Sequence, residues 1–326
     1  MSTGTAPAYF LPGWEAERGA STTLTFGTDA EAVALRLPVL TPTAIETISH
    51  TLLTAQETLA QWPIADIVDV LDRVVQHWLD PQYPYRRYAE ALLPSITHYS
   101  LPMVQHGLDT LLQAFRKESL WRLLQAEFGD PLVLDRFRPR PHSGGWTRAY
   151  GPRLVTHIFS GNVPALPAWS LICALLVKSA SLGKSASEEP LFAALFARSL
   201  WDICPDLGAC IAVGWWKGGD ETLETAAFAQ ADAVIAYGSE ATTRAIQQRV
   251  PAATLVLAYS HKLSFGVIGR EALSSLPLAR QTAEQAAYGV SVFDQQGCVS
   301  PHLLYVERGG LVAPQEFARL LAEGMA

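Results

Sequence analysis

The feature that most constrains this fold is an alternation between short apolar runs and helical periods from about residue 150 to residue 268. Six apolar runs are predicted strands: Leu154–Phe159, Ala180–Lys184, Cys210–Trp216, Ala233–Tyr237, Thr254–Ala258 and Phe265–Ile268. Predicted helices lie between them, at 164–177, 190–203, 221–230 and 240–249. Such alternation is typical of an α/β, Rossmann-type parallel sheet with helices on both faces. Open sheets of this kind bind nucleotides at the carboxyl ends of their strands.

The preceding residues show a different pattern. Alternating apolar residues on either side of Gly27-Thr28-Asp29 predict an early hairpin. Helical stripes follow at 45–59, 67–78 and 108–128, with Thr43 and Glu46 as a capping box for the first and Gly129 ending the third. Pro190 is predicted in the first turn of a later helix.

Three segments follow from these patterns. We expect a mainly helical region over 1–145, a nucleotide-binding domain over 146–270, and a final segment over 271–326 that contains two helices and Cys298. About 55 residues are too few for an easily stable separate core. The final segment is therefore expected to pack on the sheet or to begin something longer.

Composition excludes several classes of protein. Hydrophobic residues make up 49% and charged residues 17%, below the roughly 25% charged residues of average soluble domains, so a large core is expected. The net charge of −7 disfavours a nucleic-acid or anionic-membrane surface. The longest apolar stretch, 163–177, is too short for a bilayer span. Without a signal-like N-terminus, the chain is expected to be cytoplasmic.

The four cysteines fit a reducing compartment, with free thiols rather than a disulfide scaffold. Cys204 and Cys210 are six residues apart with no His or further Cys nearby, so no metal site is expected. Cys298 follows Gln296-Gly297 and precedes an apolar strand at 303–306. A thiol at such a boundary can be a nucleophile, although a buried structural cysteine is the commoner case.

Three further positions could carry chemistry. Asn162 follows the first predicted parallel strand, where its amide could bind an oxyanion or simply form a turn. Lys184 ends the second strand and could contact a ribose or phosphate, or be solvated. Gly238-Ser239 joins a strand to a helix, which suits either a phosphate or an ordinary helix cap.

Taken together, six segments resemble the LuxC-type acyl-CoA reductases, a branch of the aldehyde dehydrogenase superfamily. They are HIFSGNVP, GKSASEEPL, WWKGGDETLE, VIAYGSEAT, HKLSFGVI and FDQQGCVSP, within residues 150–306. The resemblance implies an aldehyde dehydrogenase-like fold and NADPH-dependent reduction of a long-chain fatty acyl thioester to the fatty aldehyde, as in bacterial bioluminescence. It implies as substrate a long-chain fatty acyl-CoA or acyl-protein, as partner an acyl-protein synthetase, and a homo-oligomeric state.

The same resemblance assigns residue roles. Cys298 falls on the nucleophile, Asn162 on the oxyanion-hole amide, Lys184 on the lysine at the cofactor ribose, and Gly238 and Ser239 on the pair that meets the pyrophosphate. Ser187 replaces the ribose-binding glutamate, and loss of that carboxylate favours NADPH because it removes repulsion of a 2′-phosphate.

Two further departures bear on function. Ala258 stands where oxidative family members have a general-base glutamate, which suits a reductase that needs no hydrolytic water. Only 28 residues follow Cys298, so a truncated catalytic domain is expected. Two alternatives therefore stay open: an oxidative CoA-acylating aldehyde dehydrogenase, and a non-catalytic or acyl-accepting subunit that binds a partner.

Overall fold

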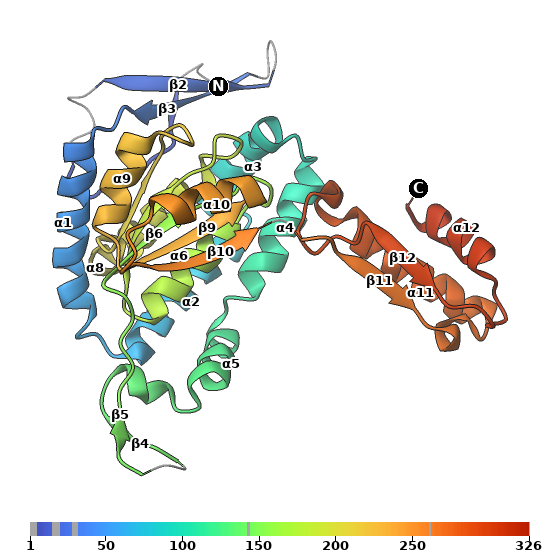
Figure 1. The fold of residues 1–326 in the computed structure, drawn as a ribbon. Coiled ribbons are helices and arrows are strands. Elements are labelled where there is room, and N and C mark those ends of the chain that lie inside the picture. The colour runs from blue at the N-terminus through green and yellow to red at the C-terminus, as the bar shows by residue number, and fades with distance from the viewer. Residues whose placement is uncertain (1–4, 15–19, 28–31, 142–143, 261, 326) are drawn as a thin grey trace. The chain divides into compact units, whose positions relative to one another are not determined.

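The computed structural model describes residues 5–14, 20–27, 32–141, 144–260 and 262–325. The chain forms two compact units, residues 1–260 and 261–326. Each unit has its own helices and strands, and each is considered by itself (Figure 1). The division predicted from the sequence, with boundaries at residues 145 and 270, is a different one and stays a prediction.

Five parallel strands form the central sheet of the first unit, in the order β10-β9-β6-β7-β8. Their bounds are β6 (Leu154–Ile158), β7 (Ala180–Lys184), β8 (Ile211–Gly214), β9 (Ala233–Gly238) and β10 (Leu255–Ser260). Five of the predicted strands thus form this sheet. The sixth, β11 (Phe265–Ile268), is a strand with the predicted bounds, but it pairs with β12 (Leu303–Val306) in the second unit. The apolar pattern of β11 predicts a strand but not its partner, because strand pairing depends on the tertiary structure.

Helices cover both faces of the central sheet. Neighbouring residues of a strand point to opposite faces, and in β6 the Thr156 hydroxyl bonds the Ala227 carbonyl while the adjacent His157 ring bonds the Ser170 hydroxyl. Helices that carry these partners therefore lie on opposite faces. The helices that follow β6 are α6 (Leu166–Leu176), α7 (Phe192–Ile203), α8 (Pro205–Gly208), α9 (Glu221–Ala229) and α10 (Glu240–Arg249). The predicted α/β class is confirmed.

The start of α7 differs from the prediction. Pro190 lies before the helix, whose N-cap is Leu191. The buried Glu189 carboxylate accepts hydrogen bonds from the backbone N–H groups of Leu191 (2.7 Å) and Phe192 (2.8 Å). This side chain satisfies the free N–H groups of the first turn, which displaces the helix start by two residues.

The N-terminal strands are β1 (Ala6–Pro7), β2 (Ser21–Phe26) and β3 (Val33–Pro38). β2 and β3 are antiparallel, as predicted for the hairpin; Thr28 and Asp29 of its turn lie outside the described residues. Phe10 exchanges backbone hydrogen bonds with Val213 of the edge strand β8, at 2.8 and 2.6 Å. The N-terminal segment therefore covers part of that open edge.

Five helices follow: α1 (Pro42–Leu59), α2 (Ile64–Leu79), α3 (Pro84–Thr97), α4 (Leu101–Gln113) and α5 (Lys117–Phe128). The predicted cap at Thr43 is wrong, because Thr41 accepts the Ala44 N–H (3.1 Å) and Pro42 occupies the first turn, where a missing N–H costs nothing. A short hairpin, β4 (Arg138–Pro139) and β5 (Trp146–Thr147), precedes the sheet.

The predicted continuous helix over 108–128 is also wrong, because it is divided between α4 and α5. The Asp72 carboxylate of α2 accepts hydrogen bonds from the Arg116 side chain (2.6 Å) and the Lys117 backbone N–H (2.9 Å). These contacts hold the turn between the two helices. They join residues more than forty positions apart, so local periodicity could not reveal them.

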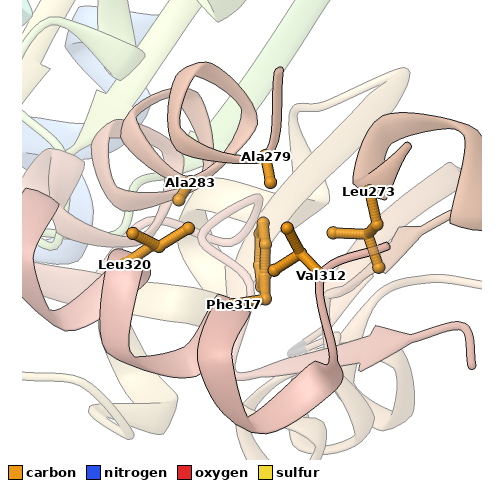
Figure 2. Close-up of a cluster of buried hydrophobic side chains, with 6 residues drawn as sticks. All are labelled: Leu273, Ala279, Ala283, Val312, Phe317 and Leu320. Atoms are coloured by element: carbon orange, nitrogen blue, oxygen red, sulfur yellow. The ribbon is translucent and has the colours of Figure 1, made fainter. Parts of the chain in front are cut away.

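The second unit contains β11, α11 (Leu276–Ser291), β12 and α12 (Pro314–Met325). Figure 2 shows its core, where the Phe317 ring of α12 lies beside Val312 and faces Ala279 of α11. Leu273, Ala283 and Leu320 complete this cluster. The final segment thus has a small apolar core of its own.

Candidate functional site

Five of the six predicted site residues lie at the carboxyl ends of parallel strands in one sheet. Asn162 follows β6, Lys184 is the last residue of β7 with Ser187 three residues beyond, and Gly238 ends β9 with Ser239 next. β6 pairs with both β7 and β9, so these positions surround the point where the strand order reverses. This is where open α/β sheets bind ligands.

The Asn162 loop is fixed by contacts that are distant in sequence. The Tyr99 hydroxyl, on a buried side chain, donates a hydrogen bond to the Asn162 backbone oxygen (2.7 Å). Gly161 packs closely on the loop after β7: a Cβ there would lie 2.8 Å from Glu188 Cβ and 3.0 Å from the Glu189 nitrogen. The backbone that carries the half-buried Asn162 side chain is therefore held on two sides.

Lys184 places a buried cation at this edge of the sheet. Its side chain is 7% exposed. Burial lowers the pKa of its ammonium, while nearby Glu224 and Glu188 act in the opposite direction. An anionic ligand beside this ammonium would offset its loss of hydration.

Six polar side-chain atoms are buried without a hydrogen-bond partner in the part of the chain that the structure describes, and two of them belong to residues just beyond β7 and β8. These two are Ser185 Oγ, directly after Lys184, and Trp216 Nε1, two residues beyond β8. Buried polar groups are normally paired. Polar atoms of a bound ligand would meet this requirement.

Ser239 directly precedes α10 and is its N-cap, since its hydroxyl accepts the Thr242 N–H (3.1 Å). Gly238 brings the backbone close to this turn, because a Cβ there would lie 3.2 Å from Thr242 Cγ2. A helix N-terminus approached through a residue without a side chain leaves backbone N–H groups accessible to a phosphate.

Cys298 lies in the second unit and its side chain is exposed. Its carbonyl oxygen accepts a hydrogen bond from Ser264 Oγ (2.6 Å), and the Ser300 N–H bonds the Gly297 oxygen (3.0 Å). The loop before it is tightly turned, with positive φ at residues 293–295. This loop presents the thiol at the surface of its unit.

Sequence reasoning missed three residues near the sheet edge: Tyr99, Glu189 and His157. The His157 ring is fully buried between the hydroxyls of Ser170 (2.8 Å) and Ser181 (3.1 Å), and burial lowers its pKa to about 3. It therefore stays neutral and is a structural hydrogen-bonding group. Tyr99 and His157 had no local signal, because their partners lie elsewhere in the chain, whereas Glu189 bonds N–H groups only two and three residues on and is a local acidic residue before a helix start.

Within the described ranges, no group of three or more His, Cys, Asp or Glu side chains could hold a metal ion. None of the helices there is long and apolar enough to cross a membrane.

The fold is that of the aldehyde dehydrogenases. Residues of this chain superpose on a benzaldehyde dehydrogenase from Corynebacterium glutamicum with a TM-score of 0.73 and 18% identity, covering 97% of this chain and 68% of that one. Lactaldehyde dehydrogenase from Escherichia coli gives a TM-score of 0.72 and 17% identity, covering 99% and 64%. These likenesses establish the aldehyde dehydrogenase-like fold.

The family model for acyl-CoA reductase (LuxC) matches residues 59–326, and the chain belongs to this family. The long-chain acyl-protein thioester reductase of Photorhabdus luminescens is 28% identical over 244 residues, covering 74% of this chain and 49% of that protein. Its Vibrio harveyi counterpart is 24% identical over 246 residues, covering 74% and 50%. The chain spans about half the length of the curated relatives it matches.

Proposed function

We propose that this chain takes part in the NADPH-dependent reduction of a long-chain fatty acyl thioester to a fatty aldehyde, through an acyl-cysteine at Cys298. The observation that carries the proposal is the gathering of Asn162, Lys184, Gly238 and Ser239 around the reversal of strand order. Family membership and the exposed Cys298 thiol support it.

The residues at the sheet edge fit a nicotinamide dinucleotide. The N-terminus of α10 would hold its pyrophosphate and the Lys184 ammonium its adenosine ribose. The buried, unpartnered Ser185 and Trp216 atoms noted above suit a polar ligand at this edge. When bound, the cofactor would supply the hydride for the reduction. Ser187 in place of a carboxylate favours the form with a 2′-phosphate.

Cys298 and Asn162 would carry the acyl chemistry. The thiolate attacks the acyl carbonyl, and CoA or a carrier-protein thiolate leaves. The family resemblance assigns the oxyanion-hole amide to Asn162, and loss of one such donor typically costs about 3 kcal/mol. After reduction, the thiohemiacetal on Cys298 collapses to the aldehyde and the free thiolate. Tyr99 holds the backbone of Asn162 in place.

The relatives' names indicate the substrate class. They are reductases of long-chain acyl-protein thioesters, so an acyl-protein or acyl-CoA is the proposed substrate here. An acyl-protein synthetase as donor partner, a homo-oligomeric state and a cytoplasmic location belong to the same proposal.

Intact-protein mass spectrometry after incubation with a long-chain acyl-CoA tests the proposal. The wild type should gain one acyl mass, Cys298→Ala should gain none, and the control Cys204→Ala, which lacks a half-buried thiol, should react like the wild type. Adding NADPH should remove the adduct and release aldehyde.

Other outcomes would redirect the interpretation. An adduct that persists with NADPH would favour an acyl-accepting subunit. Oxidation of aldehyde with CoA in preference to reduction would favour the acylating dehydrogenase. The absence of any adduct would refute the role of Cys298.

A further inference from the structure

The loops that follow β7 and β8 are joined at the sheet edge by a hydrogen bond. Trp215 Nε1, one residue beyond β8, donates to Ser187 Oγ (3.2 Å). These strands are neighbours, with Lys184 opposite Gly214. The β8 loop also approaches the Lys184 ammonium, since a Cβ added at Gly218 would lie 3.9 Å from Lys184 Nζ.

This hydrogen bond determines what the Ser187 hydroxyl can offer to a ligand. A serine hydroxyl has one donor proton and two acceptor lone pairs. Because the indole N–H occupies a lone pair, the hydroxyl proton is free to point toward an external acceptor. Ser187 is exposed, so such an acceptor can reach it.

Two lysines and two carboxylates lie on the segments around this hydroxyl, and one of the carboxylates, Glu188, directly follows Ser187 and is exposed to solvent. Lys184 lies three residues before Ser187, and the exposed Lys217 lies two residues after Trp215. The buried Glu224 is already paired with Arg249 (2.5 Å) and accepts the Gly219 N–H (3.0 Å). Its negative charge is therefore largely compensated within the protein.

We propose that Trp215 is a positioning residue that orients Ser187 toward the 2′-phosphate of the cofactor, and that Lys217 on the same loop supplies a second cation for that phosphate. This inference rests on the proposed function, because it specifies how the nicotinamide cofactor is selected. The preference for a cofactor with a 2′-phosphate would then depend on the contact between the loops after β7 and β8, as well as on the absence of a carboxylate at position 187.

Direct binding of fragments tests the inference without catalysis. The probes are 2′,5′-ADP and 5′-AMP, which differ only in the 2′-phosphate, titrated calorimetrically into the full chain. The wild type should bind 2′,5′-ADP at least about tenfold more tightly, as expected for hydrogen bonds to a charged group. Trp215→Phe keeps an aromatic ring but removes the donor, and should weaken 2′,5′-ADP by about threefold to tenfold while leaving 5′-AMP unchanged.

Three further variants and a control show whether Trp215 acts through Ser187 and whether Lys217 contributes charge. Ser187→Ala combined with Trp215→Phe should be no weaker than Ser187→Ala alone, because Trp215 acts through Ser187. Lys217→Gln should reduce the salt dependence of 2′,5′-ADP binding. Trp146→Phe, which removes an exposed indole from β5, is the control and should match the wild type.

Equal weakening of both probes by Trp215→Phe would overturn the inference, since it would indicate a general packing role. Equal wild-type affinities for the two probes would also overturn it, while leaving a nicotinamide cofactor without a 2′-phosphate in the proposed function. Failure to bind any of 2′,5′-ADP, 5′-AMP, NADPH and NADH would refute both.

Discussion

Replacing the buried Glu189 with glutamine should remove a pH-dependent loss of stability from the first unit. Burial raises the pKa of this carboxyl to about 7, although the N–H groups of Leu191 and Phe192 act to lower it. Glutamine retains an oxygen that can accept the same two hydrogen bonds but does not titrate. Comparing the two proteins therefore isolates the ionisation of one side chain.

The sign and size of this change in the free energy of unfolding follow from proton linkage. Between pH 4.5 and about pH 7 the folded carboxyl is protonated and the unfolded one is ionised, so the folded state binds more protons and stability falls as pH rises. The contribution is fully present below pH 4.5 and is lost above about pH 7. The shift corresponds to about 3 kcal/mol in total. As pH rises from 5 to 8, the free energy of unfolding of Glu189→Gln should therefore increase by about 2 to 3 kcal/mol relative to that of the wild type.

Urea denaturation followed by tryptophan fluorescence at several pH values measures this difference. All nine tryptophans lie at or before Trp216, so the signal reports the first unit alone. Glu188→Gln, the exposed neighbour, is the control and should differ from the wild type by less than about 0.5 kcal/mol at every pH. If the stabilities of the wild type and Glu189→Gln change in parallel with pH, Glu189 is ionised in the folded state and the reasoning fails.

Three other substitutions test the structure. Tyr99→Phe removes the hydrogen bond to the Asn162 backbone and should lower kcat of the proposed reduction about tenfold with little change in KM; an unchanged kcat would contradict a positioning role. Gly151→Ala would place a Cβ 2.3 Å from the Val177 carbonyl and should cost more than about 2 kcal/mol in chemical denaturation. Phe317→Ala empties the centre of the second unit's core and should cost about 3 kcal/mol, measured as faster amide hydrogen exchange confined to residues 262–325.

The sheet was predictable to within two residues at each strand end. β7 has the predicted bounds, and β9 differs by one residue. The strands of this sheet are short apolar runs separated by amphipathic or apolar helices. Such local patterns are present in any sequence that must bury a parallel sheet.

Two helix boundaries were less predictable. Asp72, more than forty residues away, divides the segment over 108–128, whereas Glu189 sets the start of α7 through N–H groups only two and three residues further on. Both are polar side chains whose hydrogen bonds reach the first turn of a helix. Propensity and periodicity report which residues can be helical, but they do not report which backbone N–H groups a carboxylate will satisfy.

The amino-acid sequence alone determined the α/β class, the positions of the strands and, through its six motif segments, the family. These properties are encoded in the local order of apolar and polar residues. Only the tertiary structure decided that the Tyr99 hydroxyl bonds the Asn162 backbone and that the Trp215 indole bonds the Ser187 hydroxyl. Such contacts depend on how strands and helices pack, because packing brings together side chains that the chain itself keeps far apart.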